Sequence, residues 1–275
     1  MCWGYIQPPD LENISYIDLW DKIVESKRHP KREKLEHYRE KVKERYDFYA
    51  SHTNSLDEIL PLKPEEWQDI ADELRGCYGN NATFRKTKKS ILEQALRCPY
   101  CTLNRPNTLD HYFDKSHYPE YAVFIPNLVP CCTECNSVKG TNVFNEAQHR
   151  CFIHFYFDTI PSYKFLFVRF TDFIVDSIPQ INISLKFREN EPMEKQIRAH
   201  FDKLSLLQKY EDAIGDRLDV VIREIRATNP RSDPQEIIEH QYYSRVQHYG
   251  INYWETCMYE GILNSDGFIE HYRDS

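Results

Sequence analysis

Four cysteines have the spacing of metal ligands. Cys98 and Cys101 form one C-x-x-C unit, and Cys132 and Cys135 form a second one further along the chain. Four thiolates match the tetrahedral coordination of Zn²⁺, with Zn–S distances of about 2.3 Å. Cys131 also lies at C-x-x-x-C spacing from Cys135, but Cys132 repeats the first unit and is preferred. Because four sulfurs leave no open position, we expect the zinc to be structural.

The loop between these two units contains residue types that suit metal-assisted hydrolysis. Asp110 and His111 are adjacent, Asn127 follows in a Pro-Asn-Leu sequence, and Asn136 comes directly after Cys135. Carboxylate and amide oxygens bind hard divalent cations, and a neutral imidazole is an effective general base near neutral pH. The grouping could therefore hold Mg²⁺ or Mn²⁺ beside a base that activates water.

The order of these residues from Cys98 to Gly140 is C-P-Y-C, L-D-H, P-N-L-V-P and C-x-x-C-N-x-x-K-G. This pattern resembles the HNH endonucleases of the ββα-metal or His-Me finger class, in their zinc-ribbon form. The resemblance implies that His111 is the general base and that Asp110 and Asn136 bind the catalytic Mg²⁺ or Mn²⁺. It also implies that Asn127 pins the loop and orients the base, and that the products carry 5′ phosphate and 3′ hydroxyl ends.

Two lysines near these residues are candidates for substrate binding. Lys139 lies one helical turn beyond Asn136, where it could contact the scissile phosphate or a neighbouring one. The path of a nucleic acid could be lined by Lys115, Arg85, Lys88 and Lys89. Alternatively, these charged side chains only make the surface soluble. His117 either approaches the metal or substrate or is an ordinary surface histidine. We expect His149 and His154 to be structural.

A second, less specific resemblance extends beyond the cysteine segment. The sequences DHYFDKSHYP, RAHFDKLSLL, NYW and MYEGILNS resemble bacterial HNH proteins of antiphage defence loci, of the Septu or retron-associated type. This resemblance implies that nucleic acid is the substrate, with DNA favoured over RNA, and that a partner ATPase senses infection. Two alternatives stay open, namely an RNA-cleaving HNH toxin acting on tRNA, and a zinc-ribbon binding module without catalysis.

The remaining sequence predicts an α+β protein, mainly helical, with a central zinc-bound ββα finger and a small antiparallel sheet after it. Helical periodicity covers 16–50 with a break at Pro30, and it returns from Glu65 and in the basic segment 83–97. Aromatic and β-branched runs between 152 and 187 predict strands: FIHFYFD, YKFLFVRF, FIVD and INISLKF. Helices are expected again after Pro192, as one long or two consecutive helices, and then over 233–249 and 254–263.

We therefore predict three regions, which are a helical region 1–95, a nuclease finger 96–150 and a region 151–275 that recognises a target or partner. The chain has 275 residues, a formal charge of −8 and 14% aromatic residues, which excludes a disordered chain and a histone-like grip on nucleic acid. No apolar run reaches the roughly 20 residues of a membrane span. Since the N-terminus lacks a secretory signal, we expect a cytoplasmic protein without membrane contact, whose nine cysteines form no disulfides.

Overall fold

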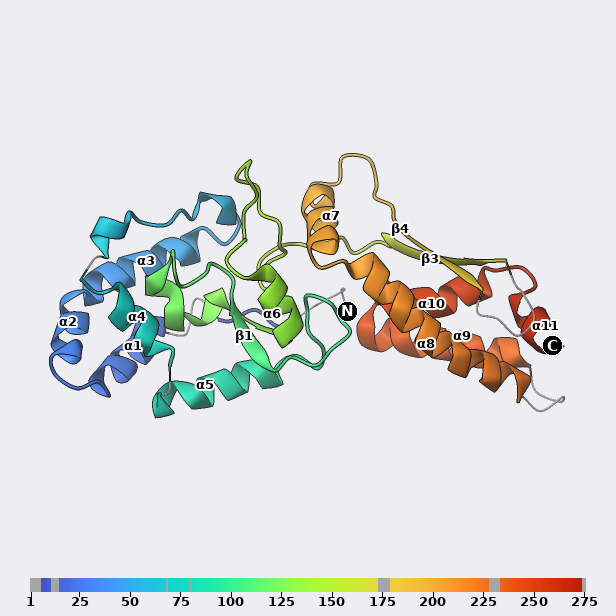
Figure 1. Ribbon diagram of the computed structural model, residues 1–275, viewed down its shortest axis with the longest axis horizontal. Coiled ribbons are helices and arrows are strands. Elements are labelled where there is room, and N and C mark those ends of the chain that lie inside the picture. The colour runs from blue at the N-terminus through green and yellow to red at the C-terminus, as the bar shows by residue number, and fades with distance from the viewer. Residues whose placement is uncertain are drawn as a thin grey trace. The chain divides into compact units, whose positions relative to one another are not determined.

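The computed structural model describes residues 6–10, 15–67, 69–79, 81–172, 179–227 and 233–273. The chain divides into two compact units, one within Gly4–Asp158 and the other within Thr159–Ser275 (Figure 1). In the described residues the fold is α+β and mainly helical, with two antiparallel sheets of two strands each. The predicted fold class is confirmed at this level. None of the described helices is both long and apolar enough to cross a membrane.

Helices make up the first part of the Gly4–Asp158 unit. The predicted break at Pro30 is confirmed, since α1 ends before it and α2 begins after it. The helix expected from Glu65 starts later, because Trp67 N donates to Pro64 O and closes a 3-10 turn there. The Asn81 side chain caps the basic helix by accepting from Thr83 N and Phe84 N. The elements are α1 Tyr16–Glu25, α2 Lys31–His37, α3 Arg39–Ser51, η1 Leu56–Glu58, η2 Pro64–Glu66, α4 Ala71–Cys77 and α5 Ala82–Glu93.

Two short strands and a helix follow in the same unit. Strand β1 (Thr108–His111) pairs antiparallel with β2 (Leu128–Cys131), and His111 lies opposite Leu128. The connection between them contains η3 (Pro119–Val123) and η4 (Ile125–Asn127). Helix α6 (Thr133–Lys139) packs on β1, and α5 packs on both strands (Figure 1). Most of the predicted regions 1–95 and 96–150 therefore lies within the Gly4–Asp158 unit.

Aromatic side chains fill the core of this unit. The Tyr49 ring makes edge contacts with Phe113, Tyr121 and Phe124, which join α3 to the connection between the strands. The segment 152–158, expected to be a strand, forms turns instead. Residues 151–156 are all buried, whereas a strand that lies against a core on one face buries alternate residues. The turn is closed by Asp158, whose Oδ2 accepts from His154 N.

The Thr159–Ser275 unit contains the second sheet, formed by β3 (Leu166–Thr171) and β4 (Gln180–Leu185). The FIVD run lies outside the described residues. Helix α10 packs on β3 and α8 packs on β4. Gly261 permits the first contact, because a Cβ atom there would lie 2.8 Å from Val168 O. The helices are α7 Glu194–Lys203, α8 Leu206–Arg226, α9 Pro234–Tyr249, α10 Trp254–Leu263 and α11 Phe268–Arg273.

Candidate functional site

The four predicted ligands Cys98, Cys101, Cys132 and Cys135 converge in the Gly4–Asp158 unit. Their sulfur atoms all lie within 4.8 Å of one another, and all four residues are buried. The Sγ atoms of Cys101 and Cys132 are 3.9 Å apart, close to the edge of about 3.8 Å for a tetrahedron with 2.3 Å metal–sulfur bonds. Cys131 is buried but does not belong to this group. The four cysteines can therefore hold a structural metal ion such as zinc.

The backbone of each C-x-x-C unit folds so that its two sulfur atoms lie close together. Thr102 N donates to Cys98 O over 2.7 Å, and Thr102 has a positive φ of 56°, so the chain folds back tightly after the first unit. Cys132 is the N-cap of α6, and its sulfur accepts from Cys135 N. The pKa of Cys132 is lowered because Cys101 and Cys135 stabilise its thiolate through hydrogen bonds. A cation among the sulfurs would extend this stabilisation to all four thiolates.

His111 ends β1 in a partly buried position. Its Nε2 lies 3.0 Å from Ala122 O, and a carbonyl oxygen only accepts, so Nε2 carries the proton. Burial lowers the pKa of His111 to about 3, and the charges of Lys115, Lys139 and Lys88 act in the same direction. The imidazole is therefore neutral at pH 7. Among the described residues Nδ1 has no hydrogen-bond partner, which leaves its lone pair able to accept a proton.

Asp110 and Lys139 form a buried ion pair next to His111. The Lys139 Nζ atom lies 3.0 Å from Asp110 Oδ1, 2.9 Å from Asp110 Oδ2 and 3.0 Å from His111 O. Tyr100 donates its hydroxyl to Asp110 Oδ2 over 2.6 Å. The side chains of Lys139 and Asp110 are 0% and 2% exposed. Lys139 therefore differs from the expected phosphate-contacting lysine, because the Asp110 carboxylate holds its ammonium group inside the fold.

The two asparagines of the predicted site have different surroundings. Asn127 is fully buried, and its amide clamps Phe113 by accepting from Phe113 N at 2.8 Å and donating to Phe113 O at 2.9 Å. This clamp fixes the backbone two residues beyond His111. Asn136 is only partly buried on α6, and its Nδ2 lies 3.5 Å from Thr108 Oγ1 on β1.

Lys115 and His117 lie in the segment that follows β1. Lys115 is partly buried, with Nζ 5.0 Å from the centre of the Tyr78 ring. His117 is exposed, and its Nδ1 lies 2.8 Å from Asp114 Oδ2. His154 is fully buried and hydrogen-bonded to the Tyr49 hydroxyl over 2.9 Å, whereas His149 is exposed.

Three residues of the site were not found by reasoning from sequence. Tyr100 holds Asp110, and it lies within the first C-x-x-C unit, so its position in the motif was an available signal. Ala122 contributes only its carbonyl oxygen, for which sequence carries no signal. Tyr78 lies at the end of α4 with its ring centre 4.3 Å from that of His111, a contact that only the tertiary fold creates.

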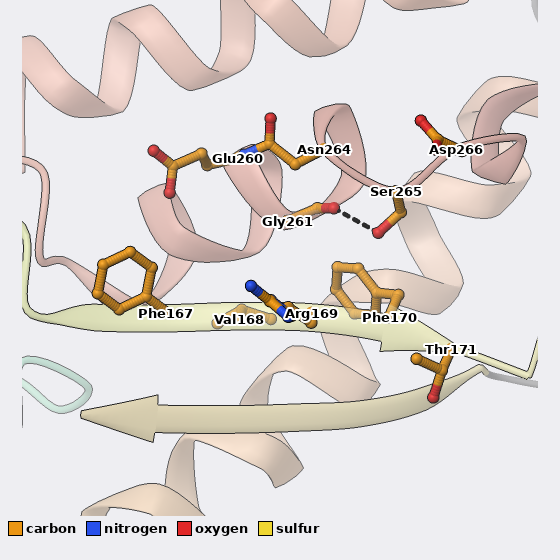
Figure 2. A pocket seen from close by; sticks show the side chains of 10 residues that line it. All are labelled: Phe167, Val168, Arg169, Phe170, Thr171, Glu260, Gly261, Asn264, Ser265 and Asp266. Atoms are coloured by element: carbon orange, nitrogen blue, oxygen red, sulfur yellow. Dashed lines mark hydrogen bonds between the residues drawn. The ribbon is translucent and has the colours of Figure 1, made fainter. Parts of the chain in front are cut away.

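A surface pocket of about 600 Å³ lies in the Thr159–Ser275 unit, between β3 and α10. Figure 2 shows the pocket-lining residues Phe167 and Arg169 on the strand, Glu260 on the helix and Asn264 directly after the helix. Ser265 donates its hydroxyl to Gly261 O at the base of the helix turn. No residue of the predicted site lines this pocket, so it is separate from the His111 site.

Comparison with known proteins finds a relative in a bacteriophage. The chain is 28% identical over 194 residues to the protein ea31 of Escherichia phage lambda, and the match covers 65% of this chain and 65% of the phage protein. The chain thus matches less than two thirds of the length of this relative, whose name states no activity. No family model matches the chain, and no solved structure matches it.

Proposed function

We propose that this protein is an HNH-type endonuclease that hydrolyses phosphodiester bonds of nucleic acid, with DNA favoured over RNA. The observation that carries the proposal is the state of His111. Its Nε2–H is bound to the Ala122 carbonyl, so Nδ1 is the ring atom that can accept a proton. The antiparallel strands β1 and β2 followed by α6 support the proposal, as does the cysteine group at their base.

The chemistry assigned to His111 is proton transfer from the attacking water. Nδ1 accepts a proton as the water oxygen bonds to phosphorus, and the bond from phosphorus to the 3′ oxygen breaks. The departing oxygen takes up a proton from solvent water and His111 returns its proton to solvent, which gives 5′ phosphate and 3′ hydroxyl ends. Asn127 supports this step as a positioning residue, because its amide fixes Phe113 and with it the end of β1.

The two metals of the proposal differ in how well the residues fit them. Zinc fits, because four buried sulfurs lie within 4.8 Å of one another, and it would stabilise the segment that holds His111. Mg²⁺ or Mn²⁺ does not fit Asp110 as the structure has it, because both carboxylate oxygens are bound by Lys139 and one also by Tyr100. We therefore assign no step to a divalent cation, and the assay below tests whether one is required.

The occupied carboxylate favours a second candidate, a zinc-stabilised binding module without catalysis. In that module the Asp110–Lys139 pair is purely structural, and His111 is a neutral, partly buried residue without a chemical role. A role in antiphage defence with a partner ATPase would accompany the endonuclease and not the binding module. This role depends on the resemblance of short sequence segments alone.

Cleavage of plasmid DNA and of total RNA by the purified protein tests the proposal. Each substrate is incubated with Mg²⁺, with Mn²⁺ and without divalent cation, and the wild type is compared with His111→Ala and His111→Gln. The control is His149→Gln, a change at an exposed histidine of the same unit.

Cutting by the wild type and the control but not by the two His111 variants supports the endonuclease, provided that the variants keep their fold and zinc content. Undiminished cutting by His111→Ala overturns the assignment of the base. Binding of nucleic acid with no cutting under any condition supports the second candidate.

A further inference from the structure

Three segments of the Gly4–Asp158 unit bring two lysines and a tyrosine together beside His111. Tyr78 follows α4, Lys88 lies on α5, and Lys115 lies beyond β1. Lys88 Nζ is 3.5 Å from the centre of the Tyr78 ring and donates to Tyr78 O, and Lys115 Nζ is 5.0 Å from the same ring centre. The Tyr78 ring contacts the His111 ring edge-on at 4.3 Å. We define Tyr78, Lys88 and Lys115 as the lysine–tyrosine cluster.

The cluster has positive charge without a matching negative charge. Neither Lys88 nor Lys115 lies within 4.0 Å of a carboxylate in the part of the chain that the structure describes, although the protein carries a net charge of −8. Other lysines of this unit, such as Lys41 and Lys43, do pair with nearby acids. Burial and the charge of Lys115 both lower the pKa of Lys88, so the two ammonium groups repel each other in this state.

An anion between the two ammonium groups would remove this repulsion. Lys88 uses one of its three N–H groups on Tyr78 O, which leaves two donors for an external acceptor. Burial raises the pKa of the Tyr78 hydroxyl to about 12, so the hydroxyl stays protonated and adds no negative charge to the cluster. A phosphate offers several acceptor oxygens and a negative charge to such donors.

We infer that the lysine–tyrosine cluster binds a backbone phosphate of the nucleic acid, next to the phosphodiester whose attacking water His111 deprotonates. This inference depends on the proposed function for its choice of ligand, because the contact between Tyr78 and His111 places the cluster at the candidate base. The cluster positions the strand and takes no part in the proton transfer.

Binding of uncleaved oligonucleotide tests the cluster separately from catalysis. Fluorescence anisotropy with labelled single- and double-stranded DNA is measured without added divalent cation, in a His111→Asn background. The test variant is Lys88→Gln with Lys115→Gln. The control is Lys63→Gln with Lys86→Gln, which changes the charge equally at two lysines of the same unit that lie outside the cluster.

We expect the test variant to bind at least about tenfold more weakly near 0.1 M salt. Its plot of log affinity against log salt should be shallower by about 1 for each phosphate that the variant no longer neutralises. The control pair should bind within about twofold of the background protein, because scattered surface charges contribute only a diffuse attraction. Lys88→Arg with Lys115→Arg should retain binding, which separates loss of charge from loss of fold.

Equal affinities for the test and control pairs overturn the inference, as does the absence of any binding by the background protein at low salt. Binding that depends on Lys88 and Lys115 in a protein whose wild type never cuts upholds the cluster and refutes the endonuclease. If the wild type cuts nucleic acid and its Lys88 and Lys115 variants bind and cut normally, the endonuclease is upheld and the cluster is refuted.

Discussion

Burial decides the charge of the residues around His111. The imidazole is neutral because its partly buried position penalises the imidazolium ion, while Lys139 stays deep in the protein because Asp110 and the His111 carbonyl bind its ammonium. A buried ion pair of this kind adds little net stability relative to apolar residues, but removing one partner leaves an unpaired charge.

Lys139→Met should therefore destabilise the protein by about 3–5 kcal/mol, since Asp110 is left buried without a counter-charge. Urea denaturation measures this loss. Lys139→Met combined with Asp110→Asn should recover much of it, because the uncompensated charge is gone. Lys63→Met, outside the ion pair, should change stability by less than about 0.5 kcal/mol. A loss below about 1 kcal/mol for Lys139→Met would show that the pair is not formed.

His154 makes the stability of the Gly4–Asp158 unit depend on pH. Burial lowers the pKa of His154 well below the usual value, and the charges of Arg150 and Lys139 act in the same direction. The Asp158 carboxylate accepts a hydrogen bond from the backbone N–H of His154, and the Tyr49 hydroxyl is hydrogen-bonded to its ring. The folded protein keeps the ring neutral at a pH where the unfolded chain has already bound a proton. Stability from this residue is complete above about pH 6.5 and decreases below it.

We expect the free energy of unfolding to fall below about pH 6.5 with a contribution from His154 of at most about 1.4 kcal/mol per pH unit. Urea titrations between about pH 5 and 8 measure the slope. His154→Gln should reduce the slope and leave the part that the lowered pKa of His111 contributes, whereas His149→Gln at an exposed position should leave the slope unchanged. An identical slope in wild type and His154→Gln would refute the linkage.

At the scale of elements, β1, β2 and α6 place the site residues. Asp110 and His111 lie on β1, Asn127 directly precedes β2, and Asn136 and Lys139 lie on α6. A hairpin of two four-residue strands is marginal by itself, so its stability comes from the cysteine group and from packing on α5.

Substitution at two adjacent cysteines tests which sulfurs hold the metal. Cys132→Ala should lose the zinc of the purified protein, because Cys132 belongs to the group of four sulfurs, and Cys131→Ala should retain it. Metal analysis by mass spectrometry gives the zinc content per chain. Retention by Cys132→Ala with loss by Cys131→Ala would assign the ligand to Cys131 instead.

The whole molecule consists of two compact units with separate cores. All four cysteines of the metal group lie in the Gly4–Asp158 unit, while the β3–β4 sheet and the helices α7 to α11 make up the Thr159–Ser275 unit. A metal ion bound by these cysteines would therefore contribute folding free energy to one unit.

We expect calorimetry to resolve two thermal transitions, of which a zinc chelator lowers only one. The Cys132→Ala protein should reproduce the melting profile of the chelated wild type. Equal lowering of both transitions by the chelator would contradict the assignment of independent units.

The sequence alone determined the features that depend on residue type and short spacing. The two C-x-x-C units predicted the four-cysteine group, helical periodicity predicted the helices around Pro30 and after Pro192, and the runs YKFLFVRF and INISLKF predicted β3 and β4. These predictions succeeded because ligand spacing and periodicity are local properties of the chain.

Only the tertiary structure decided where side chains from distant segments meet. It turned 152–158 from an expected strand into buried turns, because the aromatic core surrounds that segment. It also buried Lys139 against Asp110 and placed Tyr78 and Lys88 beside His111. A lysine in sequence gives no sign of its partner, because the free energy of its position depends on burial and on charges from other elements.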